Sequence, residues 1–139
     1  MHWMILPYRR YFDFLGRSRR KEYWMFLLFY LIVMIAIVSL FGETTSYVRG
    51  PMSVSANRTL TPLGNTVSGI FWLASIVPAL AVGVRRLHDQ GRSGWLMLIA
   101  LIPFFGWFAL LVLMLLDGTP GDNEYGPDPK GRGTVDVFR

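Results

Sequence analysis

Two short segments combine arginines with glycine, serine and a closing tryptophan, residue types suited to binding phosphate groups at a membrane surface. Residues 14–24 read FLGRSRRKEYW and residues 85–95 read RRLHDQGRSGW, so both contain Gly-Arg-Ser. A guanidinium group donates two parallel hydrogen bonds to one phosphate, serine caps helices, and tryptophan prefers the headgroup layer. We therefore expect a site for anionic lipid or a partner protein, formed by Arg17, Arg19, Arg20, Arg85, Arg86, His88, Asp89 and Arg92.

The second segment also contains a pattern that hydrolytic enzymes use. Residues 91–94 read Gly-Arg-Ser-Gly, and intramembrane serine proteases carry Gly-x-Ser-Gly. A nucleophilic Ser93 would need a base such as His88 within hydrogen-bond reach, a water path and an oxyanion hole. Three membrane spans can hardly enclose a wet pocket, and Ser93 would lie at the interface. We therefore expect no catalytic residues and no enzymatic activity.

A metal site is a further alternative for His88 and Asp89, together with acidic residues of the C-terminal tail. The chain has no cysteine and only two histidines, which excludes cysteine-based metal sites and disulfides. We expect Asp89 to pair with Arg85 or Arg92, and His88 to hold its loop in place by hydrogen bonds. No metal ion or other cofactor is predicted.

Three long uncharged stretches must position these residues: 24–41, 66–84 and 95–116. As helices they would reach roughly 27, 28 and 33 Å, which compares with a hydrocarbon core of about 30 Å. A bilayer offers no water to backbone groups, so such runs must satisfy them internally. The sequence predicts an all-α integral membrane protein with three transmembrane helices, forming one membrane domain over 1–139. A short interfacial segment lies within residues 1–22.

The third stretch carries Pro-Phe-Phe-Gly at 103–106, in its centre. Proline removes a helix hydrogen bond and glycine loosens the turn. Two structures fit this pattern: a kinked helix that crosses the membrane, or a re-entrant hairpin that returns the tail to the cytoplasm. We expect the kinked span, because each half is too short to cross alone.

The basic residues indicate the orientation. With the N-terminus in the cytoplasm, nine Lys and Arg residues lie inside and five outside. Residues 42–65 then form an external loop, 85–94 a cytoplasmic loop, and 117–139 a polar tail outside the cell. The isoelectric point of about 10.0 therefore reflects the cytoplasmic face. Such a face favours anionic phospholipid headgroups, and we expect no binding of nucleic acid.

The second stretch has small residues at four-residue spacing, Ser75, Ala79 and Gly83. Small side chains on one helix face allow neighbouring helices to approach closely. We expect this face to pack against another helix of the chain or against a second copy in a homo-oligomer.

Three groups of residues carry a resemblance to a known family. They are Gly16, Arg17, Arg20 and Trp24 near the start, the run 85–95 at every position, and Asn123, Tyr125, Gly126, Asp128 and Pro129 in the tail. In these motifs the chain resembles the family called domain of unknown function 805. The resemblance implies a small bacterial inner-membrane protein, and it brings no established activity.

Three functions are open at this point. The first is a non-catalytic membrane component that binds lipid or a partner protein. The second is a small oligomeric transporter or channel subunit, although no predicted span carries an internal charge. The third is the intramembrane hydrolase described above, and of the three we favour the first.

Overall fold

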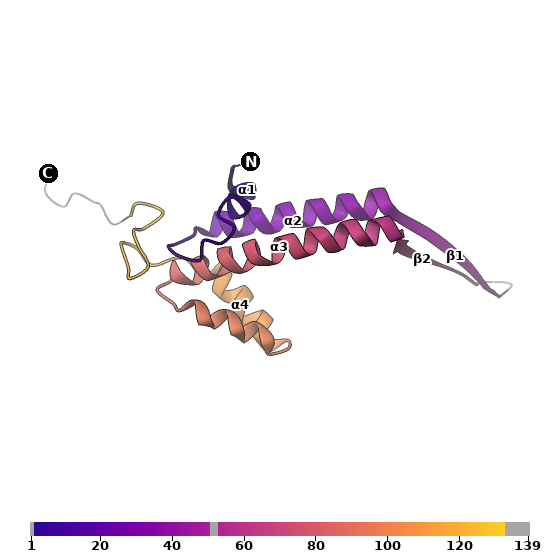
Figure 1. Ribbon diagram of the computed structural model, residues 1–139. Helices are drawn as coiled ribbons and strands as arrows, with labels where there is room; N and C mark the ends of the chain where they lie inside the picture. The colour runs from indigo at the N-terminus through magenta and orange to yellow at the C-terminus, as the bar shows by residue number, and fades with distance from the viewer. Residues whose placement is uncertain (1, 51–52, 133–139) are drawn as a thin grey trace, which may run out of the picture.

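The computed structural model describes residues 2–50 and 53–132, and its largest feature is a pair of long antiparallel helices (Figure 1). The elements in chain order are α1 (His2–Arg9), α2 (Arg20–Phe41), β1 (Gly42–Gly50), β2 (Ser53–Leu60), α3 (Pro62–His88), the 3-10 helix η1 (Gly94–Leu101) and α4 (Phe105–Leu115). α2 and α3 form the pair, and α1 packs against both of them at the end where α2 begins.

The two long helices contain the first two predicted stretches and extend beyond them. α3 begins with a side-chain N-cap: the Thr61 hydroxyl accepts a hydrogen bond from the Gly64 amide at 3.1 Å, and Pro62 occupies the first turn. α2 begins at Arg20 without a side-chain cap. Both helices are long and apolar enough to cross a membrane.

Little of either helix is covered by the rest of the chain. Within the most apolar eighteen residues, 11% are buried in α2 and 28% in α3. A core helix of a soluble protein would be mostly buried, because water would otherwise meet its apolar face. The exposed Leu and Ile side chains along α2 and α3 are therefore suited to lipid contact.

The expectation of an all-α chain is wrong for the loop between these helices. β1 and β2 form an antiparallel ribbon, in register from Gly42 opposite Leu60 through Thr45 opposite Asn57 (Figure 1). The ends of the helix pair lie side by side, and the Thr61 amide donates to the Phe41 carbonyl at 2.9 Å. The helices thus bring two polar, threonine-containing segments together, and pairing satisfies their backbone groups.

The expected single helix over 95–116 is also not observed, because the chain reverses in its middle. η1 and α4 pack against each other as a helical hairpin, and the reversal lies at 102–104. Pro103 cannot donate a backbone hydrogen bond, and Phe104 adopts a positive φ of 62°. Gly106 lies so close to the Ile99 carbonyl that any side chain would overlap it. The Trp107 indole donates to the Ala100 carbonyl at 3.0 Å across the hairpin.

This hairpin decides where the tail lies. α4 returns to the end of the pair where α2 begins and α3 ends, and the tail after it lies at that same end (Figure 1). The kinked span would have sent the tail to the opposite end. The distribution of basic residues between the two ends of the molecule therefore differs from the expected one, since Lys130 and Arg132 lie with the N-terminal arginines.

The small-residue face of α3 packs as expected in part. Gly83 lies against η1, where an added Cβ would come within 2.9 Å of the Met97 methyl group. Ser75 instead contacts α1: its hydroxyl lies 2.7 Å from the Tyr8 hydroxyl and donates to the Phe71 carbonyl at 2.7 Å.

Candidate functional site

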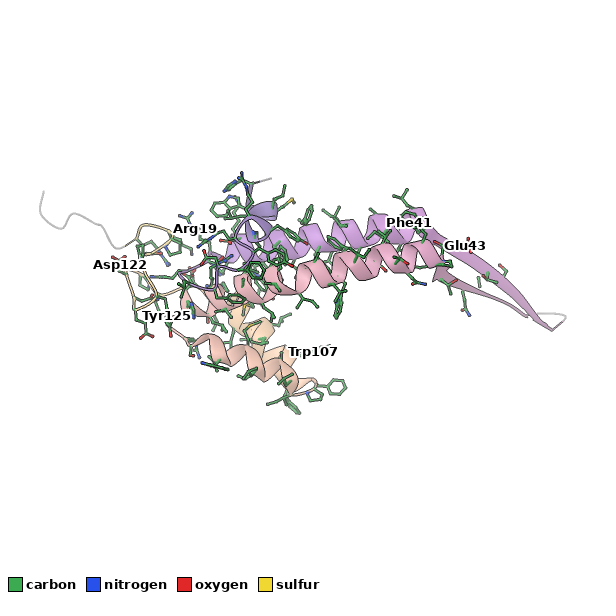
Figure 2. The ribbon with its side chains drawn as sticks, in the orientation of Figure 1. Arg19, Phe41, Glu43, Trp107, Asp122 and Tyr125 are labelled. Carbon is green, nitrogen blue, oxygen red and sulfur yellow. The ribbon has the colours of Figure 1, made fainter. Side chains whose placement is uncertain are left out.

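The basic segments gather at one end of the helix pair, which we call the basic end (Figure 2). It comprises residues 9–21, the end of α3, the turn 89–93 and the tail 117–132. The structure thus brings together the two Gly-Arg-Ser segments that are far apart in the sequence. The tail also lies at this end, although we expected it on the opposite side of the membrane.

Arg17 is the centre of this end and is 7% exposed. Its Nε–H donates to the Asp89 carboxylate at 3.0 Å. Its two terminal nitrogens donate to the carbonyls of Gly121 at 2.6 Å and Thr119 at 2.7 Å. The Asp128 carboxylate lies 3.8 Å away. One guanidinium therefore joins the end of α3 to two points of the tail.

Asp89 is shared by two arginines. It accepts from Arg17 and, at 2.7 Å, from Arg86, and all three side chains are almost fully buried. The prediction that Asp89 pairs with Arg85 or Arg92 is therefore wrong. Arg92 is exposed on the turn, and Arg85 is directed toward α2, where Glu22 attracts it.

Arg85 and Glu22 form a separate buried ion pair, with Nη2 and Oε1 at 3.0 Å. The other terminal nitrogen of Arg85 donates to the carbonyls of Arg10 and Asp13. Breaking a buried pair leaves an uncompensated charge, so this contact holds α2, α3 and the N-terminal loop together. Its role in the described structure is architectural.

His88 connects the N-terminal loop with the tail. Its Nδ1 lies 3.2 Å from the Gly16 carbonyl oxygen, and its ring stacks on Tyr125 with centroids 3.9 Å apart and planes 4° apart. Asn123 donates its side-chain amide to the His88 carbonyl at 2.9 Å. The loop-holding role predicted for this histidine agrees with these contacts, and it includes a tail contact that we did not expect.

Ser93, the candidate nucleophile, is exposed and caps η1. Its hydroxyl accepts from the Trp95 amide at 3.4 Å. Among the described residues no hydrogen bond joins Ser93 to His88. Nor do the described His, Asp and Glu side chains form a group of three or more that could hold a metal ion.

The C-terminus of α4 is capped by side chains of the basic end. The Leu113 carbonyl accepts from Gln90 at 2.5 Å, the Leu115 carbonyl from Arg20 at 3.0 Å, and the Leu116 carbonyl from Arg86. The last carbonyls of a helix lack partners within the helix and carry partial negative charge. These donors supply both hydrogen bonds and positive charge, and so fix the returning helix.

Two tail carboxylates are held ionised by basic neighbours. Hydrogen bonds from Arg132 keep the pKa of Asp128 well below the usual range of aspartate. A hydrogen bond from Lys130 lowers the pKa of Asp117 in the same way. Asp117 also lies 3.3 Å from Arg20. The tail therefore contributes acids that neutralise part of the basic end.

The predicted binding residues thus divide into two sets. The first set is buried and engaged by other groups of the chain, so it does not form an open positive surface: Arg17, Arg85, Arg86, His88 and Asp89. Arg19, Arg20 and Arg92 remain half-exposed or exposed. Arg9 and Lys21, which we did not select, are exposed as well. The sequence signal that could have identified Arg9 and Lys21 is their position next to the first Gly-Arg-Ser segment, since neither belongs to a motif of its own.

Comparison with known proteins places the chain in a family. A family profile described as "Protein of unknown function (DUF805)" matches residues 11–127. The chain belongs to this family. The matched range includes Arg17, the run 85–95 and the tail as far as residue 127, so Arg17, Asp89 and the tail carbonyls that Arg17 contacts lie within it.

Three relatives from Escherichia coli K12 are similar over most of the chain. "Inner membrane protein YhaI" is 39% identical over 133 residues, covering 94% of this chain and 97% of its own. "Inner membrane protein YhaH" is 40% identical over 130 residues, covering 94% and 98%. "Uncharacterized protein YiiR" is 29% identical over 143 residues, covering 84% and 86%. No solved structure matches the chain.

Proposed function

We propose that the protein is a non-catalytic component of the bacterial inner membrane that binds anionic phospholipid headgroups at its basic end. One observation carries this proposal. Arg9, Arg19, Lys21 and Arg92 are exposed or half-exposed, and among the described residues none of them forms an ion pair with a carboxylate. Each basic residue near an anionic surface contributes about 1 kcal/mol.

Large apolar side chains accompany these cations. Phe12, Leu15 and Trp95 are 77%, 79% and 79% exposed, and the Arg19 guanidinium lies 5.7 Å from the Trp3 ring centroid. Aromatic and basic residues together suit the headgroup layer, where one side of a ring meets lipid and the other meets water. This combination supports a phospholipid ligand over a soluble anion.

The proposal includes a cytoplasmic location for the N-terminal loop and for the tail 117–132. With the tail at the basic end, the described basic residues divide unequally between the two ends of the helix pair. The β ribbon holds Arg49 and Arg58, and the basic end holds Arg9, Arg10, Arg17, Arg19, Arg20, Lys21, Arg85, Arg86, Arg92, Lys130 and Arg132. Basic residues near membrane spans favour the cytoplasmic side. The excess of basic residues at the basic end is larger than the excess of nine over five in the expected topology, and so supports a cytoplasmic location for this end more strongly.

Two observations support a non-catalytic role over the alternatives. His88 is engaged by Gly16 and Tyr125 rather than by Ser93, so the histidine that the sequence offered as a base is not hydrogen-bonded to the candidate nucleophile. The uncharged stretches 24–41 and 66–84 supply no internal charge for an ion or proton relay.

The test is lipid retention by the purified chain. The protein is placed in nanodiscs of mixed phosphatidylglycerol and phosphatidylcholine, and native mass spectrometry counts the lipids that remain bound after release. Replacing Arg19, Lys21 and Arg92 by glutamine removes about 3 kcal/mol of attraction, so phosphatidylglycerol retention should fall by about 100-fold.

Two control variants sharpen this test. Arg58→Gln removes one exposed charge from the β ribbon at the opposite end and should leave retention unchanged. Arg19→Lys with Arg92→Lys keeps the charge and removes the guanidinium fork, so an intermediate loss indicates bidentate phosphate contacts. Wild-type retention in the triple glutamine variant would contradict the proposal.

A further inference from the structure

Asp117, the first residue of the tail, lies among three cations of the basic end. Its carboxylate is 3.3 Å from the Arg20 guanidinium and 3.6 Å from that of Arg132. It also accepts a hydrogen bond from the Lys130 ammonium. No other carboxylate of the described residues lies within ion-pair distance of more than two basic side chains. Three positive charges therefore converge on one negative charge, although Arg132 also pairs with Asp128.

This cluster is open to its surroundings, unlike the ion pairs in the interior of the basic end. The side chains of Asp117 and Arg20 are 46% and 43% exposed. Those of Lys130 and Arg132 are 27% and 31% exposed. An exposed ion pair contributes little net stability, because water solvates both partners when they separate. Another anion can therefore replace the Asp117 carboxylate at a small cost.

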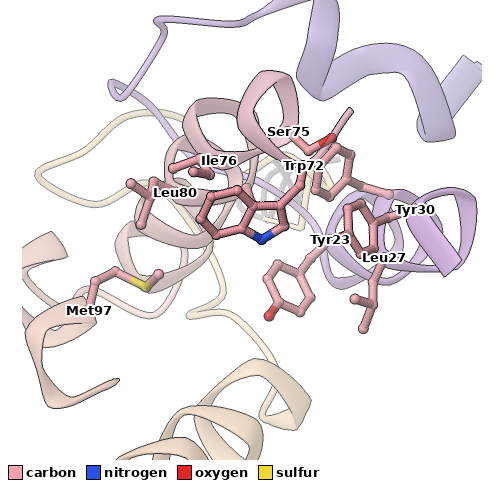
Figure 3. A pocket seen from close by; sticks show the side chains of 10 residues that line it. Tyr23, Leu27, Tyr30, Trp72, Ser75, Ile76, Leu80 and Met97 are labelled. Atoms are coloured by element: carbon pink, nitrogen blue, oxygen red, sulfur yellow. The ribbon is translucent and has the colours of Figure 1, made fainter. Parts of the chain in front are cut away.

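The cluster also lies at the boundary between the apolar and the polar parts of the chain. Arg20 is the first residue of α2, and Tyr23, one turn later, already lines an apolar groove with Tyr30 (Figure 3). Asp117 directly follows the uncharged stretch 95–116. In a bilayer the apolar part of a membrane helix ends where the hydrocarbon core ends. This boundary is therefore the level of the phospholipid phosphates.

We propose that Asp117 occupies a binding site for the phosphate of an anionic phospholipid, and that the phosphate displaces this carboxylate from Arg20, Lys130 and Arg132. A phosphodiester resembles a carboxylate in having two oxygens that share one negative charge, and arginine and lysine bind both groups. The inference rests on the proposed function and adds paired cations to the unpaired ones named there. Because the two anions exclude each other, lipid binding and the docking of Asp117 oppose each other.

A purely structural role in holding the tail is the alternative for Asp117. The tail is already held nearby, because the buried Arg17 donates to the carbonyls of Thr119 and Gly121. Exposed contacts of Asp117 add little to this attachment. The excess of cations and their level at the headgroups support an exchangeable anion instead.

The chain has two lysines, Lys21 and Lys130, which makes a direct measurement possible. The wild-type chain, labelled with ¹⁵N at the lysine Nζ atoms, is placed in membranes of phosphatidylglycerol and phosphatidylcholine. Solid-state NMR then measures the dephasing of each ¹⁵N signal by lipid ³¹P, and Lys130→Arg identifies the Lys130 signal by its loss. We expect dephasing at Lys130, and a larger dephased fraction in Asp117→Asn because the competing charge is gone.

Lipid counting by native mass spectrometry compares two matched variants. Asp117→Asn and Glu124→Gln each remove one negative charge from the tail, and the exposed Glu124 forms no ion pair among the described residues. Asp117→Asn should raise phosphatidylglycerol retention about fivefold, which is the value of one charge near an anionic surface. Glu124→Gln should change retention by less than about twofold, since it frees no cation. Excess inorganic phosphate should leave retention unchanged.

Three results would each overturn the inference: no dephasing at Lys130, equal retention in the two variants, or loss of retained lipid to inorganic phosphate. The last result would assign the site to a soluble anion. Failure of the proposed function is a different result, namely wild-type retention in the triple glutamine variant. Retention lost in that variant with no dephasing at Lys130 supports headgroup binding and rejects the Asp117 site.

Discussion

Arg17 and Asp89 are separated by 72 residues in the sequence and form a buried ion pair of 3.0 Å. The pair joins the N-terminal loop to the end of α3, and Arg17 then extends to two carbonyls of the tail. Arg17 thus holds the segments of the basic end together from its buried interior. The cations on its outer surface are other residues, namely Arg9, Arg19, Lys21 and Arg92.

The first prediction concerns this pair. Arg17→Met removes the only guanidinium that joins Asp89 to Thr119 and Gly121 in the described residues. Breaking a buried pair by removing one partner costs about 3–5 kcal/mol, so thermal unfolding in detergent should occur at a clearly lower temperature. The tail should also become sensitive to trypsin. Arg19→Gln, at a half-exposed position without an ion pair, should change stability by less than about 1 kcal/mol.

The second prediction tests the hairpin. Gly106→Ala places a methyl group on the Ile99 carbonyl, so η1 and α4 must separate and the chain should lose stability by at least about 1–3 kcal/mol. Gly69→Ala is the matched control, because nothing lies within 4 Å of its added Cβ. In a helix interior that change should be stabilising by about 0.5–1 kcal/mol. Equal melting temperatures for both variants would contradict the packed hairpin.

The third prediction concerns topology. A fluorescent protein fused after Arg132 should fluoresce, and alkaline phosphatase fused at the same residue should be inactive, because the tail lies at the basic end. Alkaline phosphatase fused after Thr45, in β1, should be active. The kinked three-span topology requires the reverse result for both fusions after Arg132.

The fourth prediction is a pH dependence of tail docking. The Arg132 hydrogen bonds hold the pKa of Asp128 below the ordinary aspartate value, which is about 3.9 in an unfolded chain. A lowered folded-state pKa contributes stability that is fully present above about pH 4 and is lost as the pH falls through that pKa. Hydrogen exchange of residues 117–132, corrected for its intrinsic pH dependence, should show protection at pH 6 that weakens below pH 4.

A variant separates this titration from general acid unfolding. Asp128→Asn should reduce tail protection at pH 6, since the amide cannot hold Arg132 and Arg17 as the carboxylate does. Exchange in the middle of α2 should stay unchanged in this variant. Wild-type protection of its tail would show that Asp128 does not hold the segment.

The helices and the meeting of the two Gly-Arg-Ser segments were predictable from local signals. Uncharged runs of sufficient length require helices in lipid, and Thr61-Pro62 marks the start of α3. The ribbon was not predictable in this way. Its residues are polar, which indicates a loop. They pair as strands because α2 ends at Phe41 beside Thr61, the residue that caps the start of α3.

The reversal at Pro103 was ambiguous for a different reason. Proline and glycine at that spacing fit both a kinked span and a hairpin, and the length of the stretch led us to expect the span. The hairpin depends on contacts from distant residues, above all Gln90 and Arg20 at the C-terminus of α4. Asp89 was ambiguous likewise, because helix spacing favours Arg85 until Glu22 of another helix attracts that arginine.

The position of Arg17 has a consequence for synthesis of the chain. Its acceptors on the tail, Thr119 and Gly121, follow it by 102 and 104 residues. At about 5–20 residues per second, translation delivers them roughly 5–20 seconds after Arg17 leaves the ribosome. During that interval the arginine remains hydrated outside the bilayer and cannot be buried without leaving donors unsatisfied. A nascent chain that stops before the tail therefore keeps this end open, so closure around Arg17 distinguishes a finished chain from a truncated one.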